Sequence, residues 1–336
     1  MPAELRKDPV TGRWVIISAE RAKRPIGFQE TIVERSGGFC PFCEGNEQHT
    51  PPELLAYRNG SERDQPGWSL RVVSNKYPAL QIEGELNREG EGMFDKMSGI
   101  GAHEVIVETP QHDQTLAKMP LKNIENLFWA FRDRVLDLKK DKRFRYILLF
   151  KNEGHAAGAS LEHSHSQIIA LPIIPKLAGE EIAGAKAYFQ YKERCVYCDI
   201  IMQERNEQSR IIEENPDFVA LSPFAPRFPF ETWVLPKQHG AFFEDAQKRE
   251  YEHLAKMLKS LLLKMDKVLE SPPYNMIIHS SPFYENTQDF YHWHMELMPK
   301  MSKIAGFEWG TGFYINPTPP EEAAQFLRDT VVHPEK

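Results

Sequence analysis

Two Cys-x-x-Cys pairs divide the 336-residue chain into halves that carry the same motifs in the same order. Cys40 and Cys43 are followed by a histidine-containing loop, a long helical pattern and a strand-like segment that opens with "HSHSQ". Cys195 and Cys198 are followed by the same series, which closes with "YHWHMELMP". This repetition of several motif types in one order predicts that the chain folds as two copies of one unit.

The helical patterns of the two halves agree position by position. Their apolar residues recur at offsets of 0, 3, 6, 7, 10, 14 and 17, the stripe of an amphipathic helix that packs on a sheet. The first set is Leu121, Ile124, Leu127, Phe128, Phe131, Val135 and Leu138, and the second is Tyr251, Leu254, Met257, Leu258, Leu261, Met265 and Val268. The spacing therefore predicts one long helix in each half.

Short β-rich runs flank the first predicted helix, at Val105–Val107, Tyr146–Phe150 and Ile168–Leu171. Strands before and after a helix favour an antiparallel sheet with the helix on one face. We predict an α+β fold of two tandem domains, residues 1–180 and 181–336, each with such a sheet and one long helix. The join falls near Pro172–Gln190, where a proline-rich loop gives way to a helical pattern.

The four cysteines are the only ones in the chain, and paired thiols of this spacing are typical of zinc or redox sites. Two separated pairs, each followed by histidines, favour zinc, which prefers four tetrahedral sulfur and nitrogen ligands. The predicted ligands of the first site are Cys40, Cys43, His112 and His163, and the repeat assigns Cys195, Cys198, His239 and His292 to the second. Four protein ligands close each site, so we expect two structural zinc ions per chain.

The motif "HSHSQ" places His163, His165 and Gln167 on one face of a strand, because side chains alternate along a strand. If His163 binds the metal, His165 cannot easily reach the same ion. His165 is then available for chemistry.

Composition limits the other classes of function. The net charge of −7 and the pI near 6.0 argue against a nucleic-acid-binding protein. They also argue against a zinc-ribbon interaction module, the main alternative explanation of two Cys-x-x-Cys pairs. The first residues do not resemble a signal peptide, and no apolar run reaches the length of about 18 residues that a membrane helix needs. We expect a cytoplasmic protein with no membrane partner.

Eight segments resemble the galactose-1-phosphate uridylyltransferase family of the histidine-triad superfamily. They are "DPVTGRWVIIS", "RAKRP", "CPFCEGN", "VVSNKYPAL", "TPQHDQTL", "KNEGHAAGAS", "HSHSQ" and "YHWHMELMP". The resemblance covers most of the chain. It implies nucleotidyl transfer between a nucleotide sugar and a sugar phosphate by double displacement, through a covalent nucleotidyl-histidine.

The resemblance also implies roles for individual residues. His165 occupies the nucleophile position, and Gln167 would donate a hydrogen bond to a phosphate oxygen. The implied substrate-binding residues are Arg21, Arg24, Asn75, Asn152, Gly158, Ala159, Ser160, Phe307 and Glu308. In the family the two arginines reach into a neighbouring subunit's site, which implies a homodimer.

The second half is expected to be inert in catalysis. Glu296 stands where the first half has Gln167, and a carboxylate there would repel a phosphate. This half also lacks a counterpart of the glycine-bearing "GHAAGAS" loop. We expect it to hold metal, to build the dimer and to contribute sugar contacts.

The choice of substrate rests on the resemblance alone. Uridylyl transfer from UDP-glucose to a hexose 1-phosphate such as galactose 1-phosphate is the first expectation. "HSHSQ", the second cysteine pair and "FEWGTGFYINP" are similar to the ADP-glucose phosphorylase branch, which transfers the nucleotidyl group to phosphate. A dinucleoside polyphosphate phosphorylase is a further alternative. Some family members bind iron through a glutamate and histidines, so the second metal stays open between zinc and iron.

Overall fold

A single ten-stranded sheet runs through the protein, and each half supplies five neighbouring strands. The computed structural model describes residues 2–23 and 38–334. In spatial order the strands are β10 (Ile211–Glu214), β11 (Phe218–Leu221), β12 (Thr232–Pro236), β14 (His294–Pro299), β13 (Tyr274–His279), β8 (Tyr146–Glu153), β9 (His165–Leu171), β7 (Ala102–Val107), β4 (Trp68–Ser74) and β3 (Glu53–Arg58). All neighbours in this sheet are antiparallel.

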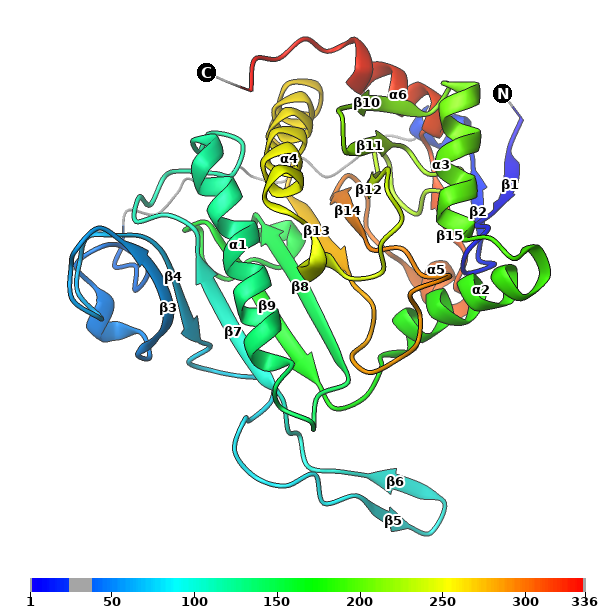
Figure 1. Ribbon diagram of the computed structural model, residues 1–336. Coiled ribbons are helices and arrows are strands. Elements are labelled where there is room, and N and C mark those ends of the chain that lie inside the picture. The colour runs from blue at the N-terminus through cyan, green and yellow to red at the C-terminus, as the bar shows by residue number, and fades with distance from the viewer. Residues whose placement is uncertain (1, 24–37, 335–336) are drawn as a thin grey trace.

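The two halves meet where β13 pairs with β8, and the strand order reads alike outward from this line (Figure 1). On the first-half side the order is β8-β9-β7-β4-β3, and on the second-half side it is β13-β14-β12-β11-β10. The predicted α+β class, with antiparallel strands and long helices, is confirmed.

Two long helices, α1 (Leu121–Leu138) and α4 (Lys248–Leu269), cover one face of the sheet (Figure 1). Of the apolar positions predicted to face the sheet, all are buried except Leu121 and Val268, which are partly exposed. A capping box between Gln247 and Glu250 fixes the start of α4. The helices contact each other through Trp129 and Tyr251, whose ring centroids are 4.9 Å apart. One apolar core therefore spans both halves beneath the helices.

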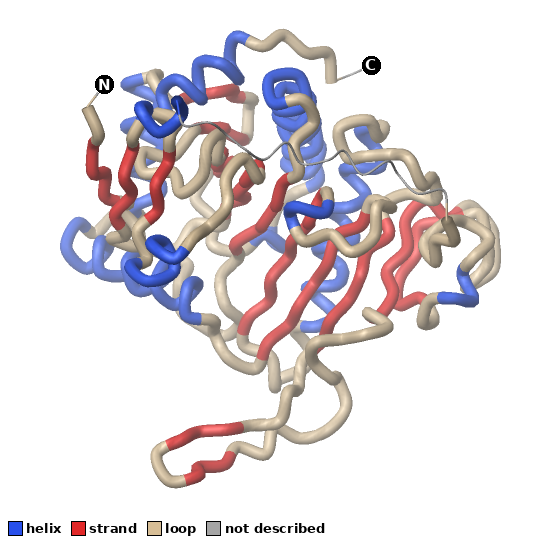
Figure 2. Tube along the Cα trace, turned by 180° about the vertical axis from the view of Figure 1, so that it is seen from behind, coloured by secondary structure: helices blue, strands red, loops and turns tan. Residues whose placement is uncertain are grey.

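The opposite face of the sheet differs between the halves. Over the second half lie α2 (Lys176–Lys192) and α3 (Val196–Glu207), which pack on Trp233 and Leu235. Over the first-half strands Figure 2 shows loops and short helical turns in place of long helices. One face of the first half is thus left for a site.

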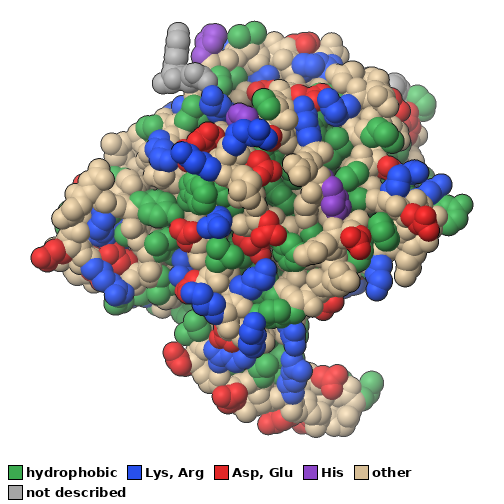
Figure 3. Space-filling view, in the orientation of Figure 1, with side chains coloured by type: hydrophobic (Ala, Val, Ile, Leu, Met, Phe, Trp, Pro, Cys, Tyr) green, Lys and Arg blue, Asp and Glu red, His purple; other side chains and the backbone are tan. Residues whose placement is uncertain are grey.

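The remaining elements lie at the margins. A small sheet of β1 (Glu4–Lys7), β2 (Trp14–Ile17) and β15 (Tyr314–Asn316) adjoins the second half, with α5 (Gly306–Thr311) and α6 (Pro320–Asp329). A hairpin of β5 (Glu89–Glu91) and β6 (Phe94–Lys96) projects from the first half (Figure 1). Figure 3 shows Lys and Arg side chains gathered at its base, where Arg88, Lys142, Arg143 and Arg145 help to line a hollow of about 510 Å³. Among the described residues, no helix is both long and apolar enough to span a membrane.

Candidate active site and metal-binding groups

The strand β9 places the two chemical residues of "HSHSQ" on the sheet face away from α1. Gln167 lies between Val105 of β7 and Phe150 of β8, and His165 pairs with Val107. Ser166, which stands between them in the chain, points to the opposite face of the sheet. Ile168 points to that same face, where it lies in the core under α1. The alternation predicted from the motif is therefore present.

The imidazole of His165 is held in one tautomer. Its Nδ1 donates to the backbone carbonyl of His163 at 2.8 Å, because a carbonyl can only accept. The lone pair is then on Nε2. Burial, and next the nearby charge of Lys151, lower the pKa of His165 below its usual value. The phenyl ring of Phe42 lies 5.5 Å from the imidazole ring. The side chain is therefore a neutral imidazole held in one orientation.

His103, to which the sequence assigned no role, is hydrogen-bonded to Gln167 and lies beside Asn75. Its Nδ1 accepts from the backbone N–H of Ala79 at 3.2 Å, so its Nε2 carries the proton. That Nε2 donates to Gln167 Oε1 at 2.8 Å and lies 3.1 Å from Asn75 Nδ2. Because the amide oxygen of Gln167 is engaged, its NH₂ group is the end that remains to donate. The motif itself gives no sign of this contact. The place of His103 beside Gln167 follows only from the pairing of β7 with β9.

A buried ion pair lies on the reverse side of β9. Lys151 Nζ contacts Glu108 Oε2 and Ser164 Oγ, each at 2.9 Å, and donates to the carbonyl of His165 at 3.2 Å. The hydroxyls of Ser164 and Ser166 each donate to Glu108, at 2.5 Å. Lys151 and Glu108 are fully buried, so the two serines of "HSHSQ" help to satisfy a charged pair that cannot reach water. These contacts hold β9, the strand that carries His165, from its reverse side.

Asn152 and the "GHAAGAS" loop meet beside the line where the halves join. Asn275 of the second half donates to Asn152 Oδ1 at 2.7 Å and to the carbonyl of Ala157 at 2.8 Å. Gly158 has φ of 92°, a left-handed conformation that favours glycine. Ala159 and Ser160 come next, and two residues separate them from "HSHSQ". Asn275 was not predicted, because only the pairing of β13 with β8 brings it here.

The first predicted metal group is assembled. The ligand atoms of Cys40, Cys43, His112 and His163 all lie within 4.8 Å of one another. Cys43 Sγ is 3.4 Å from His112 Nδ1 and 3.7 Å from His163 Nδ1. The other nitrogen of His163 donates to the carbonyl of Thr109 at 2.7 Å. Burial, and then the second thiol, raise the pKa of Cys43 to about 11, so two thiolates here need a cation beside them.

The second predicted group has the same form. Cys195, Cys198, His239 and His292 again have their ligand atoms within 4.8 Å. Cys198 Sγ is 3.4 Å from His239 Nδ1 and 3.6 Å from His292 Nδ1. The Nε2 atoms of both histidines donate to carbonyls, at 2.6 Å for His239 and 2.9 Å for His292. In His163, His239 and His292 Nδ1 therefore faces the sulfurs with its lone pair, as a metal ligand requires.

A third group that could hold a metal, Glu181, His279 and His294, was not predicted. The His279 ring stacks on His294 at 4.6 Å and lies between two carboxylates, 3.2 Å from Glu181 and 3.4 Å from Glu296. Burial opposes its protonation, but Glu181 and Glu296 raise the pKa of His279 to about 10. His279 is thus a buried imidazolium paired with acids. Only the placement of α2 against β13 and β14 reveals it.

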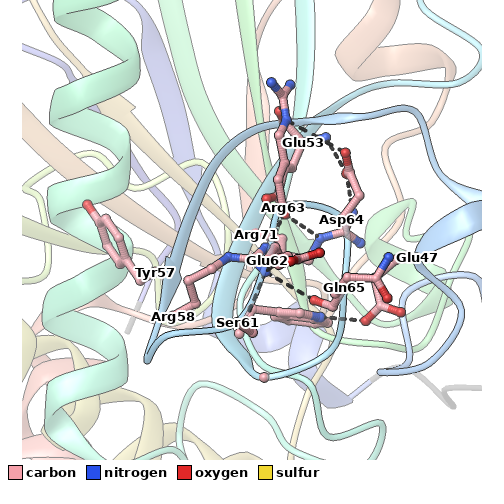
Figure 4. Close-up of polar contacts among 12 residues, drawn as sticks. Glu47, Glu53, Tyr57, Arg58, Ser61, Glu62, Arg63, Asp64, Gln65 and Arg71 are labelled. Carbon is pink, nitrogen blue, oxygen red and sulfur yellow. Dashed lines mark hydrogen bonds and ion pairs between the residues drawn. The ribbon is translucent and has the colours of Figure 1, made fainter.

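Ion pairs and hydrogen bonds brace the first cysteine loop against β3 and β4 (Figure 4). Glu47 accepts from the backbone N–H of Gly45 and, at 2.7 Å, from the indole of Trp68. Burial opposes ionisation of this carboxyl, but the bond from Trp68 and backbone donors lower the pKa of Glu47. Arg71 joins Glu53 at 3.2 Å and Asp64 at 3.3 Å. The loop that carries Cys40 and Cys43 is therefore held to the sheet.

Three of the remaining predicted substrate residues lie beside the small sheet. Arg21 is exposed on the turn Ala19–Lys23 after β2. Phe307 and Glu308 lie on α5, before β15, and Phe307 is 45% exposed. This is the side of the molecule that carries the second-half strands (Figure 1), so the fold does not bring these residues to His165 of the same chain. Arg24 lies outside the described residues.

Comparison with known proteins identifies the family. The N-terminal domain of galactose-1-phosphate uridyl transferase matches residues 2–175, and the C-terminal domain of the same enzyme matches residues 181–327. The chain belongs to the galactose-1-phosphate uridylyltransferase family, whose members here are nucleotidyltransferases.

Two curated relatives span nearly the whole chain. ADP-glucose phosphorylase of Arabidopsis thaliana is 38% identical over 97% of this chain and 92% of its own length. The galactose-1-phosphate uridylyltransferase of Thermotoga maritima is 36% identical over 98% of this chain and 99% of its own length. The crystal structure of the Arabidopsis phosphorylase with bound ADP-glucose matches with a TM-score of 0.85 and 37% identity, over 98% of this chain and 100% of that one.

Proposed function

We propose that this protein transfers a nucleotidyl group by two displacements at His165, with UDP-glucose as donor and a hexose 1-phosphate as acceptor. The observation that carries the proposal is the bond from His165 Nδ1 to the carbonyl of His163, which leaves Nε2 unprotonated on the sheet face without long helices. Nε2 attacks the α-phosphorus while the bond from that phosphorus to the oxygen of the leaving hexose 1-phosphate breaks. The incoming acceptor's phosphate oxygen then attacks, and the P–N bond breaks.

Charge that develops in these steps meets groups already in place. The NH₂ of Gln167 donates to a non-bridging oxygen, because His103 holds its other end. While phosphorylated, the imidazole is cationic, and the His163 carbonyl supports that charge through Nδ1–H. We assign the nucleoside to Asn75 and Asn152, and the phosphates to Gly158, Ala159 and Ser160.

Zinc is the proposed metal of both cysteine groups, two ions per chain. Zinc bond lengths of about 2.3 Å to sulfur and about 2.0 Å to nitrogen give a sulfur–nitrogen edge of about 3.5 Å in a tetrahedron. The observed separations of 3.4–3.7 Å agree with that edge. Bound zinc would fix the loops of each half and, through His163, the start of the catalytic strand. The two thiolates of the second group favour zinc over iron bound through oxygen and nitrogen.

The proposed working unit is a cytoplasmic homodimer. Arg21, Phe307 and Glu308 lie on the small sheet, away from His165. We assign them, with Arg24, to the active site of the partner subunit. The domain boundary at residues 180 and 181 is likewise a proposal.

Adenylyl transfer from ADP-glucose to phosphate is the second candidate. It is favoured by the likeness to the Arabidopsis phosphorylase, whose structure contains ADP-glucose. The test is to incubate the protein separately with UDP-glucose and ADP-glucose labelled at the α-phosphate. Label on His165 from UDP-glucose that galactose 1-phosphate removes supports the first candidate. Label from ADP-glucose that phosphate removes supports the second, and no label from either donor overturns nucleotidyl transfer at His165.

A further inference from the structure

A cavity in the second half occupies the place that Asn75 occupies in the first. Strand registers establish the equivalence, since Val73, Val105 and Gln167 lie side by side across β4, β7 and β9. Their counterparts across β11, β12 and β14 are Leu221, Trp233 and Glu296. Two residues beyond Val73 is Asn75, and two beyond Leu221 is Pro223.

An aromatic side chain lies against the second histidine of His-x-His in both halves. Phe42 and Tyr197 are the third residues of the two cysteine motifs. Phe42 lies 5.5 Å from His165, and Tyr197 lies 4.9 Å from His294, between ring centroids. The second-half cavity has a volume of about 370 Å³ and lies beside Tyr197. Residues next to Tyr197 in the chain and residues that follow β11 line it. Its volume falls within the usual range of small-molecule sites, about 300–1,000 Å³.

The lining combines aromatic and apolar walls with one unsatisfied acceptor. Trp233, Phe224 and Ile200 supply the walls. Glu204, at 4% exposure, uses Oε1 to accept both bonds from Arg210, at 2.8 and 3.0 Å. No donor of the described residues reaches its buried Oε2. A buried oxygen without a partner costs about 1–3 kcal/mol, which a ligand N–H would recover.

The charges at the cavity disfavour a phosphate. Asp8, Asp199 and Glu204 line it, whereas the guanidinium of Arg210 is already engaged by Glu204, Glu207 and Glu321. The remaining cation, Lys7, stands exposed at the mouth. A neutral, flat ligand with an N–H donor fits better than an anion.

We propose that this cavity is a second ligand site, which binds a neutral nucleoside whose base carries an amino group. That the ligand is a nucleoside rests on the proposed function, because a nucleoside is assigned to Asn75 at the equivalent place, whereas the amino group is chosen to match the unpartnered Glu204 Oε2. The base would lie among Trp233, Phe224 and Ile200 and donate to Glu204 Oε2. The second half would then sense free nucleoside while the first half carries out transfer.

Equilibrium dialysis of the full-length protein with labelled adenosine tests the site, with uridine and AMP as comparators. Phe224→Ala removes an aromatic wall at an exposed rim, and Glu204→Gln removes the acceptor charge. Glu207→Gln is the matched control, a carboxylate of α3 that also pairs with Arg210 but lies outside the cavity. We expect saturable adenosine binding, weakened at least tenfold in both cavity variants and unchanged in the control, with AMP weaker than adenosine.

Covalent labelling of His165 is measured on the same samples and should be equal in all of them. Adenosine binding that is absent, that survives both cavity variants, or that falls equally in Glu207→Gln would overturn the site. Because Phe224→Ala keeps both charged members of the buried Glu204–Arg210 pair, a folding defect in Glu204→Gln alone does not obscure the answer. Loss of labelling with intact, cavity-dependent adenosine binding would instead reject the proposed function and leave the second site standing.

Discussion

The two halves share a strand order and a metal-ligand pattern, yet they treat the second histidine of His-x-His in opposite ways. His165 lies on a sheet face that loops and short turns of the described residues cross, with a neutral amide two residues further on. His294 is buried beneath α2 and α3, stacked on the cationic His279, with a carboxylate two residues further on. Burial, and next the charge of His279, lower the pKa of His294 to about 4.

Register shows how few substitutions separate the two environments. Gln167 becomes Glu296, and Asn152, two residues beyond Phe150, becomes His279, two residues beyond Ile277. Beneath the histidine strand, Ile278 and Met295 stand where the first half has Lys151 and Ser166. The same backbone therefore supports the proposed nucleophile in one half and a packed imidazole in the other, according to what covers the face and which charge lies two residues along.

The largest expected difference between the halves is the effect of replacing the second histidine of His-x-His. His165→Asn is expected to lower turnover by about 10⁴-fold or more, since removal of a covalent nucleophile has effects of this order. His294→Asn should leave labelling per folded molecule unchanged. Labelling is measured after gel filtration, with metal content as the check on folding. Labelling that persists in His165→Asn would refute the assignment.

Loss of either metal should lower the free energy of unfolding, but only loss of the first should abolish covalent labelling. Cys40→Ser and Cys195→Ser should each lose one zinc per chain by elemental analysis. Each should lose more than about 4 kcal/mol of unfolding free energy, a size typical of lost metal sites. Cys40→Ser should also lose labelling, because His163 positions the catalytic strand, whereas Cys195→Ser should retain it in the folded fraction. A wild-type protein with no zinc would contradict both.

The ion pair below β9 is specific to the first half. Lys151→Met leaves Glu108 buried without a cation and also removes the ion pair with Glu153, which should cost about 3–5 kcal/mol of unfolding free energy in urea titrations. Adding Glu108→Leu should recover most of that loss, because the pair is then replaced by apolar side chains, as in the second half. If the double variant is no more stable than Lys151→Met, the buried charge left on Glu108 is not the cause of the lost unfolding free energy.

Gln167→Glu copies the second half into the first. It should slow labelling about 10²-fold, because a donor to the phosphate is replaced by a negative charge. The reciprocal Glu296→Gln should not make His294 reactive, since α2 and α3 still cover it. Stopped reactions followed by peptide mapping give both rates, and label on His294 would show that the charge alone silences the second half.

The smallest expected effect is in pH dependence. The reactive form of His165 is neutral, and its pKa is lowered below 6.5 by burial and by Lys151. Labelling should therefore persist as pH falls to 6.5, where an unperturbed imidazole would lose about half its rate. The midpoint of the decline should lie below that pH. Single-turnover rates between pH 5 and 8 measure it, and a midpoint above 6.5 would contradict the assigned environment.

The sequence alone predicted the repeat, both groups of cysteines and histidines that could hold a metal, and the placing of His163, His165 and Gln167 on one face of a strand. Those inferences rest on spacing, because period-two and helical patterns are local and the repeat supplied a second copy of each ligand set. It also indicated the long helices, whose apolar stripes are the buried faces of α1 and α4.

Only the tertiary structure brought in the residues that tune the site. His103, Lys151, Glu108 and Asn275 are ordinary in the sequence and acquire roles through strand pairing. The same holds for Glu181, which reaches His279 from a helix 98 positions earlier in the chain. Burial and charge neighbours depend on which strands meet and what covers them, and no local pattern encodes either.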